Sequence, residues 1–341
     1  MNQKITIRDV AKYANVSSAT VSYVLNGVNK VSDETKNRVL QAIEELNYQP
    51  DFTAISLSKR ESKMIGVIMP LVGESLAPLF KENHYISELL SGVEFMCRSK
   101  GYDFLISGIS KAEECKTWVM KRNLDALLVL GKFPKKVFYE MKTLSTPLIF
   151  VDSFEDYSAS YYNIRIDDEH GGYLGTKHLI ELGHRNLCFI PNGRIDCDVD
   201  GQRFQGFKRA LAEANIEFHP GMVIEGSTNS FESGYEIGEE LVRQRQLTGI
   251  FTSSDIKALG IMKSLTDIGV NVPQDVSVVG FDDLMISRYS SPSLTTIRQD
   301  VFRKGSVAAE VAIQVIEKKE DEPKEIMLPV ELVVRGSTTK I

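Results

Sequence analysis

The first fifty residues alternate apolar and polar positions at the spacing of short helices. Thr6 can cap the first of them, with Asp9 placed three residues later to reach back to the cap amide. Asn15 suits the left-handed conformation that ends a helix. The small apolar face between these residues consists of Val10, Ala11 and Ala14.

A second helix is predicted after the cap residue Ser17. Its inward positions are Val21, Val24 and Leu25. Its outward positions are Ser18, Ala19, Ser22 and Tyr23. Two short helices joined by a tight turn indicate a helix-turn-helix unit, whose second helix can enter a DNA major groove. By periodicity alone, an ordinary helical cap or a protein-docking module fits the same pattern.

A third helix is predicted to start at Ser32, with Asp33 and Glu34 in its first turn, where the helix dipole favours acids. We expect it to end before Pro50, because a proline disfavours helical geometry in the residue that precedes it. Its expected buried face consists of Val39, Leu40, Ile43 and Leu46.

From Met64 onward, buried strands alternate with helices, which predicts doubly wound parallel sheets. The expected strands are 65–70, 103–109, 126–131, 147–152, 187–192, 249–254 and 276–283. The expected helices are 86–102, 169–184, 202–216, 234–245 and 254–269. About ten strands are too many for one open sheet, so we expect two α/β subdomains with a ligand cleft between them.

Composition is that of a soluble globular protein, with 43% hydrophobic and 25% charged residues in 341. No apolar run is long enough for a membrane helix, and the polar N-terminus does not resemble a secretory signal. Four scattered cysteines favour a reducing cytoplasm over a disulfide framework. Residues 1–63 carry nine basic and seven acidic side chains, whereas the whole chain has a net charge of −6. This asymmetry is consistent with DNA contact at one end of the chain.

The first sixty residues resemble the headpiece of the LacI/GalR family of bacterial transcription regulators. The matching strings are D-V-A-x-x-A at 9–14, V-S-x-x-T-V-S at 16–22 and V-L-N-G at 24–27. The resemblance implies a headpiece over 1–49 that reads the DNA operator. The headpiece residues that it implies in DNA binding are Thr6, Ser17, Ser18, Ala19, Thr20, Ser22, Tyr23 and Asn26. Tyr23 stands where the family frequently has arginine.

Residues 50–63 have an apolar face on a segment of just over two turns, which is too short to be a stable helix alone. A disordered linker is the simpler interpretation of its Ser, Lys and Glu content. The resemblance implies instead a hinge helix that forms when two copies pack on DNA. In it Leu57 matches the residue that wedges into the minor groove, and Ala54 matches the small residue at the helix contact. Asp51 departs from the asparagine that is frequent there.

The resemblance extends over the body, 64–341, which is similar to the periplasmic sugar-binding-protein fold. The matching stretches are 166–186, 201–211, 272–283 and 293–300. The implied chain path crosses three times between two subdomains. Subdomain 1 is expected to hold 64–165 and 299–327, and subdomain 2 to hold 166–297 and 328–337.

Signatures of catalysis, cofactor binding and metal binding are missing from the sequence. The first strand is followed by LVGESLAP, so no dinucleotide fingerprint is present, and neither a phosphate loop nor a G-x-S-x-G elbow occurs. The five histidines lack metal-ligand spacing. The acids Asp167, Asp168 and Glu169 could form a carboxylate cluster, but they are better explained as charges at a helix N-terminus. We therefore expect no enzyme, no cofactor and no metal.

Two residues are the principal candidates for effector binding. Arg203, in a G-x-R-x-x-G-F string, matches the family arginine that contacts ligand oxygens, and a guanidinium suits bidentate contacts. Asp282 lies at the carboxyl end of a strand, where ligands of α/β proteins bind. We expect Arg203 to be half-exposed in the cleft. The alternative is a structural ion pair between Arg203 and Asp282.

Three further effector candidates rest on position. Asp152 follows the strand PLIFV at the expected edge of the cleft. Ser254 stands where the family commonly has asparagine, which indicates a ligand different from a simple hexose. Phe80 could provide an aromatic face for a sugar ring, although core packing explains it equally well.

These features predict a homodimeric, cytoplasmic transcription repressor of carbohydrate-metabolism genes, controlled by a small sugar-like effector. A two-fold pair is expected because one headpiece reads only a few base pairs, so the operator should be pseudo-palindromic. The family's tetramers use a leucine-heptad tail, which the sequence does not show after LVVRGST. A phosphocarrier co-regulator stays open. The alternatives are a stand-alone sugar-binding protein, which would lack 1–63, and an α/β enzyme such as a sugar-modifying transferase.

Overall fold

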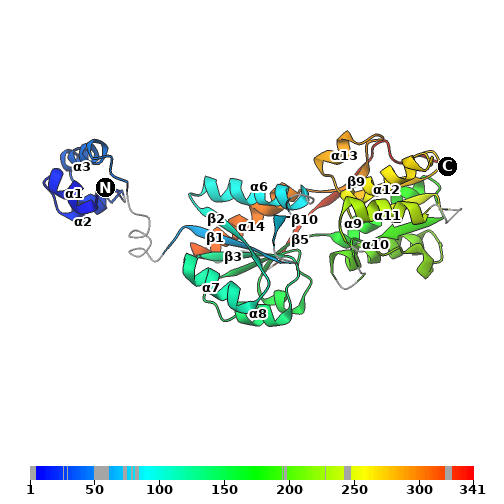
Figure 1. The fold of residues 1–341 in the computed structure, drawn as a ribbon, viewed down its shortest axis with the longest axis horizontal. Helices are drawn as coiled ribbons and strands as arrows, with labels where there is room; N and C mark the ends of the chain where they lie inside the picture. The colour runs from blue at the N-terminus through cyan, green and yellow to red at the C-terminus, as the bar shows by residue number, and fades with distance from the viewer. Residues whose placement is uncertain are drawn as a thin grey trace. The chain divides into compact units, whose positions relative to one another are not determined.

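The computed structural model divides the chain into two compact units, Met1–Lys63 and Met64–Ile341, called here the headpiece and the body (Figure 1). Each is described by itself. The residues that the structure describes are 5–25, 27–28, 30–49, 61–71, 75–77, 80, 84–193, 195, 198–226, 228–241, 247–318 and 325–341.

The described headpiece holds three helices, α1 (Ile7–Tyr13), α2 (Ser18–Leu25) and α3 (Asp33–Glu45). The predicted caps are confirmed. The backbone N–H and the hydroxyl of Thr6 donate to Asp9 at 2.8 and 2.7 Å, and the Ser17 hydroxyl accepts from the Thr20 N–H at 3.1 Å. Asn15 has a φ of 52°, as expected for the residue that follows α1. The helices enclose a small core of Val10, Ala11, Ala14, Val21, Val39, Ala42 and Tyr48.

One expected core residue of the third helix is wrong, and the helix ends earlier than a stop set by Pro50 would place it. Leu40 is 46% exposed, because Val39, Ala42, Ile43 and Leu46 already form the inward face and Leu40 lies about 100° around the helix from Val39. The helix ends at Glu45, well before Pro50, since Asn47 takes the left-handed conformation with a φ of 46°. Tyr48 then packs into the core, so the end of the helix is set by the asparagine.

The body is built on two sheets. The first is wholly parallel in the order β10-β5-β4-β3-β1-β2. Its strands are β1 (Met64–Pro70), β2 (Asp103–Ile109), β3 (Ala126–Leu130), β4 (Leu148–Val151), β5 (Tyr162–Ile166) and β10 (Glu325–Leu328). The second has the order β11-β9-β8-β7-β6, with β11 antiparallel at its edge. Its strands are β6 (Leu187–Ile190), β7 (Gly249–Thr252), β8 (Ser277–Asp282), β9 (Thr295–Gln299) and β11 (Val330–Val333).

All seven strands expected from apolar runs are present, and the described residues contain four more. The additional strands are β5, β9, β10 and β11. Each contains polar or charged side chains, because β10 and β11 lie at sheet edges and β5 and β9 are next to them. The chain passes between the two sheets after β5, after β9 and after β10.

Helices cover both faces of each sheet, as Figure 1 shows. On the first sheet, α6 (His84–Ser99) packs with α14 (Val301–Ile316), and α7 (Ala112–Arg122) packs with α8 (Lys135–Met141). On the second sheet, α9 packs with α10 and α11 packs with α12. These four helices are α9 (Asp168–Glu181), α10 (Val199–Glu213), α11 (Phe231–Leu241) and α12 (Asp255–Asp267). The short helix α13 is Met285–Tyr289. Among the described helices, none has the length and apolar content that a membrane crossing requires.

Helices α9 and α10 touch backbone to backbone through glycines. A Cβ added at Gly172 would lie 2.0 Å from the carbonyl oxygen of Arg203, and one at Gly206 would lie 2.0 Å from that of Glu169. Such distances are far below van der Waals contact, so only glycine permits this approach. The approach brings the first turn of α9 beside Arg203.

Candidate effector site and DNA-binding face

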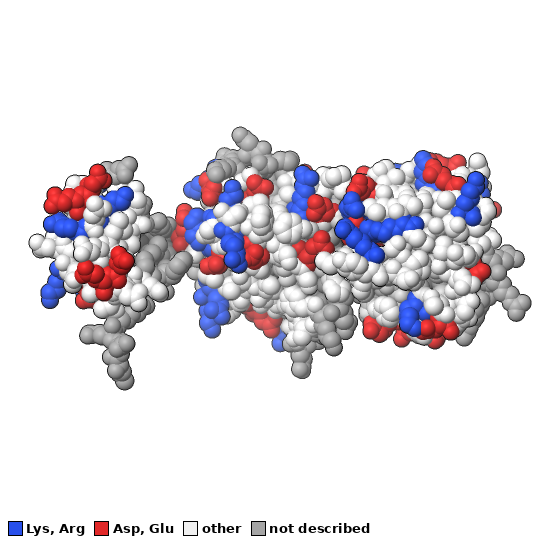
Figure 2. All heavy atoms as spheres, turned by 90° about the horizontal axis from the view of Figure 1, so that it is seen from above, with Lys and Arg blue, Asp and Glu red and all other residues white. Residues whose placement is uncertain are grey.

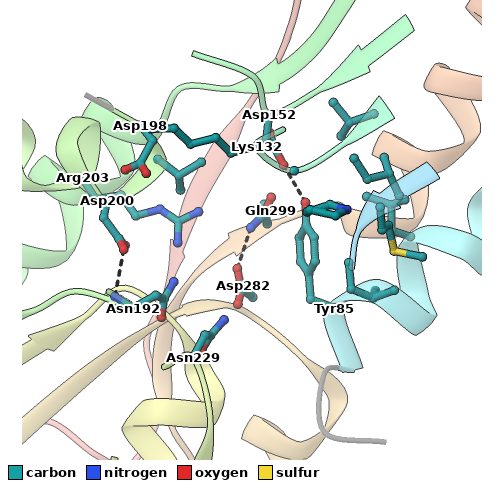
Figure 3. A pocket seen from close by; sticks show the side chains of 18 residues that line it. Tyr85, Lys132, Asp152, Asn192, Asp198, Asp200, Arg203, Asn229, Asp282 and Gln299 are labelled. Atoms are coloured by element: carbon teal, nitrogen blue, oxygen red, sulfur yellow. Dashed lines mark hydrogen bonds between the residues drawn. The ribbon is translucent and has the colours of Figure 1, made fainter. Parts of the chain in front are cut away.

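A cavity of about 440 Å³ lies between the two sheets of the body. Its wall on the first sheet includes Tyr85 of α6 and Asp152, which follows β4. Its wall on the second sheet includes Asn192 after β6, Arg203 of α10 and Asp282 at the end of β8. The residues at the carboxyl ends of parallel strands thus meet across the space, as α/β folds predict (Figure 3).

Arg203 lines this cavity but is not half-exposed, which corrects the expectation from the sequence. Only 4% of its surface is accessible. Its Nε donates to Asp168 at 2.9 Å, its Nη1 donates to the Ser253 carbonyl at 2.5 Å, and its guanidinium carbon lies 3.5 Å from the ring centre of Phe281. These two bonds use two of its five N–H donors.

The ion-pair partner of Arg203 is Asp168, and no ion pair with Asp282 is seen among the described residues. Asp168 is 2% exposed at the start of α9, where the glycine contact places it against α10. Burial raises its pKa, and Arg203 opposes that rise. Of its neighbours, Asp167 caps α9 as expected of an acid there, and Glu169 pairs at the surface with Arg209. The three acids therefore have three different roles.

The opposite wall is organised around a fully buried lysine. Lys304 Nζ donates to both carboxylate oxygens of Asp152 at 2.8 and 2.7 Å, to the Gln299 side-chain oxygen at 2.6 Å and to the Tyr85 hydroxyl at 3.2 Å. The Tyr85 hydroxyl donates in turn to Asp152 at 2.6 Å. The amide of Gln299 donates to Asp282 at 2.5 Å, so hydrogen bonds run from α6 to the end of β8.

Asp282 and the neighbouring Asp255 are buried carboxylates in unusual environments. Asp282 is 7% exposed and lines the cavity, whereas Asp255 is fully buried. Asp255 accepts from the Leu284 N–H at 2.8 Å, the Ser287 hydroxyl at 2.7 Å and the Thr296 hydroxyl at 2.5 Å. Burial raises the pKa of Asp255 to about 8 and that of Asp282 to about 7, and the two charges also disfavour each other.

Two acids of the cavity wall have strained backbone conformations. Asp152 and Asp282 have φ values of 53° and 117°, although neither is glycine. Positive φ at non-glycine residues is uncommon and tends to be retained at functional sites. Here it turns each carboxylate out of the end of its strand and into the cavity wall.

Two effector candidates from the sequence do not line the cavity. Ser254 is buried, and its hydroxyl donates to the side-chain oxygen of Asn229 at 2.7 Å. Because Asn229 does line the cavity, Ser254 lies one residue behind the wall. Phe80 is 37% exposed, and its backbone N–H donates to the Leu76 carbonyl.

Sequence reasoning did not identify several wall residues, notably Tyr85, Asn192, Asp200, Gln299 and the supporting Lys304. Of these residues, Lys304 could have been recognised from the sequence. It occupies the apolar face of α14 together with Val301, Gly305 and Ala308, and a lysine among such positions must find buried partners. The others could not be recognised, because their significance depends on which strand ends meet.

The proposed DNA-reading residues of the described headpiece lie on α2 and in its cap, except Thr6, which caps α1. Tyr23 is 40% exposed, with Lys30 Nζ 5.9 Å from its ring centre. Thr6, Ser17 and Ala19 are exposed, and Ser18, Thr20 and Ser22 are half-buried. Ser17 and Thr20 bond to each other in the cap of α2. Asn26, Ala54 and Leu57 lie outside the described residues.

Charged side chains of both signs are intermixed on the surfaces in view (Figure 2). The modest basic excess of 1–63 therefore does not form one large basic patch on the described face in view. Groups of three or more side chains able to hold a metal ion do not occur among the described residues.

Comparisons with known proteins agree with this architecture. Residues 6–51 match the model of bacterial regulatory proteins of the lacI family, and residues 176–338 match the periplasmic binding protein-like domain. The HTH-type transcriptional repressor PurR of Haemophilus influenzae (strain PittEE) is 36% identical, over 98% of this chain and 99% of the relative.

Solved structures match over nearly the full length. The lac repressor dimer bound to operator and the anti-inducer ONPF gives a TM-score of 0.84 at 29% identity, covering 99% of this chain and 100% of that one. The complex of the transcriptional regulator CelR with cellobiose gives 0.74 at 27%, covering 98% and 99%. The expected fold, a helix-turn-helix headpiece with a periplasmic-binding-protein-like body, is confirmed. The chain belongs to the LacI family and is a DNA-binding transcriptional repressor.

Proposed function

We propose that this repressor controls carbohydrate-metabolism genes in the cytoplasm, as a homodimer on a pseudo-palindromic operator, and that a small sugar-like effector sets its operator affinity. Residues 1–49 would read the operator, 50–63 would form the hinge and 64–341 would bind effector and partner subunit. The effector would bind between Arg203, Asp152 and Asp282.

The observation that carries the sugar-like effector is the chemistry of the cavity wall. Carboxylates, amides and a guanidinium converge there, whereas Tyr85 is the single aromatic residue among its described lining. Charged and amide groups suit ligands rich in hydroxyls, since each carboxylate can accept from neighbouring O–H groups. A planar heterocycle would favour stacking surfaces on both sides. The similar structure of CelR, solved as a complex with cellobiose, supports the same choice.

The cavity also suggests how effector binding could reach the DNA. Its walls belong to different sheets, and the Lys304–Gln299–Asp282 hydrogen bonds join them. A ligand bound to both walls would favour one arrangement of the two subdomains, because it contacts groups on each. In a dimer that arrangement would set the spacing of the two hinge segments, and so of the two headpieces.

The test is an operator-binding assay with the full chain. The duplexes are taken from pseudo-palindromes near the gene, and a panel of monosaccharides, disaccharides and free nucleobases is added. We expect one carbohydrate class to change operator affinity at least tenfold and to leave scrambled DNA unaffected. Regulation by a nucleobase with no response to any carbohydrate would refute the sugar-like effector.

A further inference from the structure

The electrostatics of the cavity point to the charge of its ligand. Six carboxylates lie in or directly behind its described wall: Asp152, Asp168, Asp198, Asp200, Asp255 and Asp282. The buried cations in the same region are Arg203, Lys257 and Lys304. Lys132 also lines the cavity, but its side chain is 59% exposed and pairs with Glu155. Among the described residues, carboxyl groups therefore outnumber the cations of this region, and ionising all of them inside the protein would be costly.

The cations are already engaged by the protein. Lys304 is held by Asp152, and Arg203 is held by Asp168. Lys257 donates to the backbone carbonyls of Pro191 and Asn192 at 2.7 and 2.9 Å. None of these three forms an ion pair with Asp200 or Asp282 in the described part of the chain.

Asp200 and Asp282 therefore face the cavity with hydrogen bonds from neutral donors. One oxygen of Asp200 accepts the N–H groups of Asn192 and Gly193 at 3.0 and 3.1 Å, and Asp282 accepts from Gln299. The other oxygen of Asp200 is buried without a hydrogen-bond partner among the described residues, and Asp200 is only 8% exposed. Figure 3 shows both residues on the same side of the cavity.

The titration behaviour of the region agrees with this excess. Burial raises the pKa values of Asp168, Asp255 and Asp282, although nearby cations or hydrogen-bond donors stabilise the ionised form of each carboxylate. A further cation at the wall would relieve the cost of ionising these carboxylates.

We propose that the effector carries a positive charge: it is a hydroxylated primary amine, such as an amino sugar, whose ammonium group binds at Asp282 and Asp200. This proposal rests on the proposed function, since it names the chemical class of the same effector. An ammonium brings three N–H donors and one unit of positive charge to Asp200 and Asp282, for which no ion pair is seen among the described residues. The hydroxyls of the same ligand would use the amides and Arg203. A phosphorylated or carboxylated sugar would add negative charge beside Asp200 and Asp282, with Arg203 already paired.

The first experiment needs no ligand. Asp200→Asn keeps an oxygen for the two backbone N–H groups and removes the charge. It should raise the unfolding midpoint of the ligand-free body by about 2–4 °C. The matched control is Glu236→Gln, the same isosteric change on the exposed face of α11, which should leave the midpoint unchanged. A midpoint for Asp200→Asn that is unchanged or lower than the parent's would contradict the excess of negative charge.

The second experiment is calorimetry of the full chain with matched triplets: a hexosamine, its neutral parent hexose and the hexose phosphate. We expect at least one hexosamine to bind tenfold or more tightly than its parent, with no binding of the phosphate. Asp200→Asn should remove that preference and change the affinity for the neutral sugar little. Asp282→Asn should also remove the preference, but it should weaken binding of the neutral sugar as well, because Asp282 belongs to the proposed effector site.

The outcomes separate this proposal from the proposed function. A neutral sugar or a sugar phosphate that binds as tightly as the matched amine, and also shifts operator affinity, overturns the positive charge and keeps the carbohydrate effector. If no carbohydrate of any charge binds or acts on the operator complex, both fail.

Discussion

The headpiece and the cavity of the body place their candidate functional side chains in opposite environments. In the headpiece, Tyr23 and Ala19 are exposed on α2, while the core beneath them consists of residues such as Val10 and Val21. In the cavity, Arg203 and Asp282 are themselves buried and hydrogen-bonded within the protein. If these side chains act as proposed, we expect function and stability to be separable in the headpiece and coupled in the cavity.

The difference follows from what each surface must contact. A DNA-reading helix enters a hydrated groove, so its side chains must protrude and stay free to reach base edges. An effector site encloses a small ligand and removes its water, so its polar groups are buried before the ligand arrives. Buried charges are tolerated only with partners, which explains why Asp168 stands behind Arg203 and Lys304 behind Asp152.

The largest effect that tests this coupling is expected for Arg203→Ala. The substitution leaves Asp168 buried without its cation, which typically costs about 3–5 kcal/mol of folding free energy. Effector response should be lost as well. The measurement is urea unfolding followed by the fluorescence of Trp118, the single tryptophan and a residue of the body.

A matched control lies two turns along the same helix. Arg209 pairs with Glu169, but its side chain is 42% exposed, so Arg209→Ala should cost at most about 1 kcal/mol. Equal stabilities of the two variants would mean that the cavity arginine can be removed as freely as a surface one. The coupling of function and stability in the body would then be wrong.

The burial of Arg203 shows what could not be predicted from the sequence alone. The G-x-R-x-x-G-F string identified the arginine, and the strand ends identified Asp282 and Asp152, because both signals are local. The burial of Arg203 depends on Asp168, 35 residues earlier, and on a helix contact that Gly172 and Gly206 permit. The sequence contains those glycines, but periodicity does not say which helix they approach.

The fold shows the same difference between local features, which the sequence predicts, and features that depend on contacts distant in the sequence. Caps such as Thr6 and Ser17, and the seven apolar strands, could be predicted because neighbours within a few residues determine them. The strands β5, β9, β10 and β11 could not, since their polar residues are tolerated only near a sheet edge. The path of the chain between the two sheets was expected only from the family resemblance.

The pH dependence of folding stability is a second test of the difference between the headpiece and the body. Burial raises the pKa of Asp255 to about 8 and that of Asp282 to about 7, against the ordinary value of 3.8. The folded body then binds more protons than the unfolded chain, so its stability falls as pH rises toward 8. Between pH 6.5 and 8 we expect a loss of about 1 kcal/mol per pH unit.

Other groups do not cancel this slope in that window. Burial lowers the pKa values of His178 and His184 below 6.5, so their contribution opposes the slope at the lower end of the window and is complete only above about pH 7.5. Burial lowers the pKa of Lys257 to about 8, so the folded lysine loses its proton toward the upper end of the window and flattens the slope near pH 8. The shifted pKa values of the described headpiece belong to Asp9, Tyr13 and Glu45, which titrate outside the window. Urea titrations should therefore show a falling midpoint by Trp118 fluorescence, and a flat profile would refute it.

A third prediction concerns the hinge segment, which lies outside the described residues. A leucine wedged between base pairs costs unstacking energy, which the bend and the added groove contacts offset. Leu57→Ala should therefore lower operator affinity at least tenfold and spare scrambled DNA, whose binding rests on phosphate contacts. Salt-matched titrations of both duplexes, with bending followed by energy transfer, measure this. Equal losses on both duplexes, or an unchanged bend, would make the segment only a tether.

The smallest effect on stability is expected at Tyr23, where a small change in folding free energy should accompany a clear change in operator preference. Its side chain is 40% exposed on α2, so Tyr23→Ala should change folding free energy by less than about 0.5 kcal/mol, as an exposed tyrosine such as Tyr139 also would. Operator preference should nevertheless change. Tyr23→Arg should create a preference for guanine at one position, because a guanidinium can contact guanine through two hydrogen bonds. Binding to randomised half-sites measures both, and a preference that survives Tyr23→Ala unchanged would remove Tyr23 from the reading face.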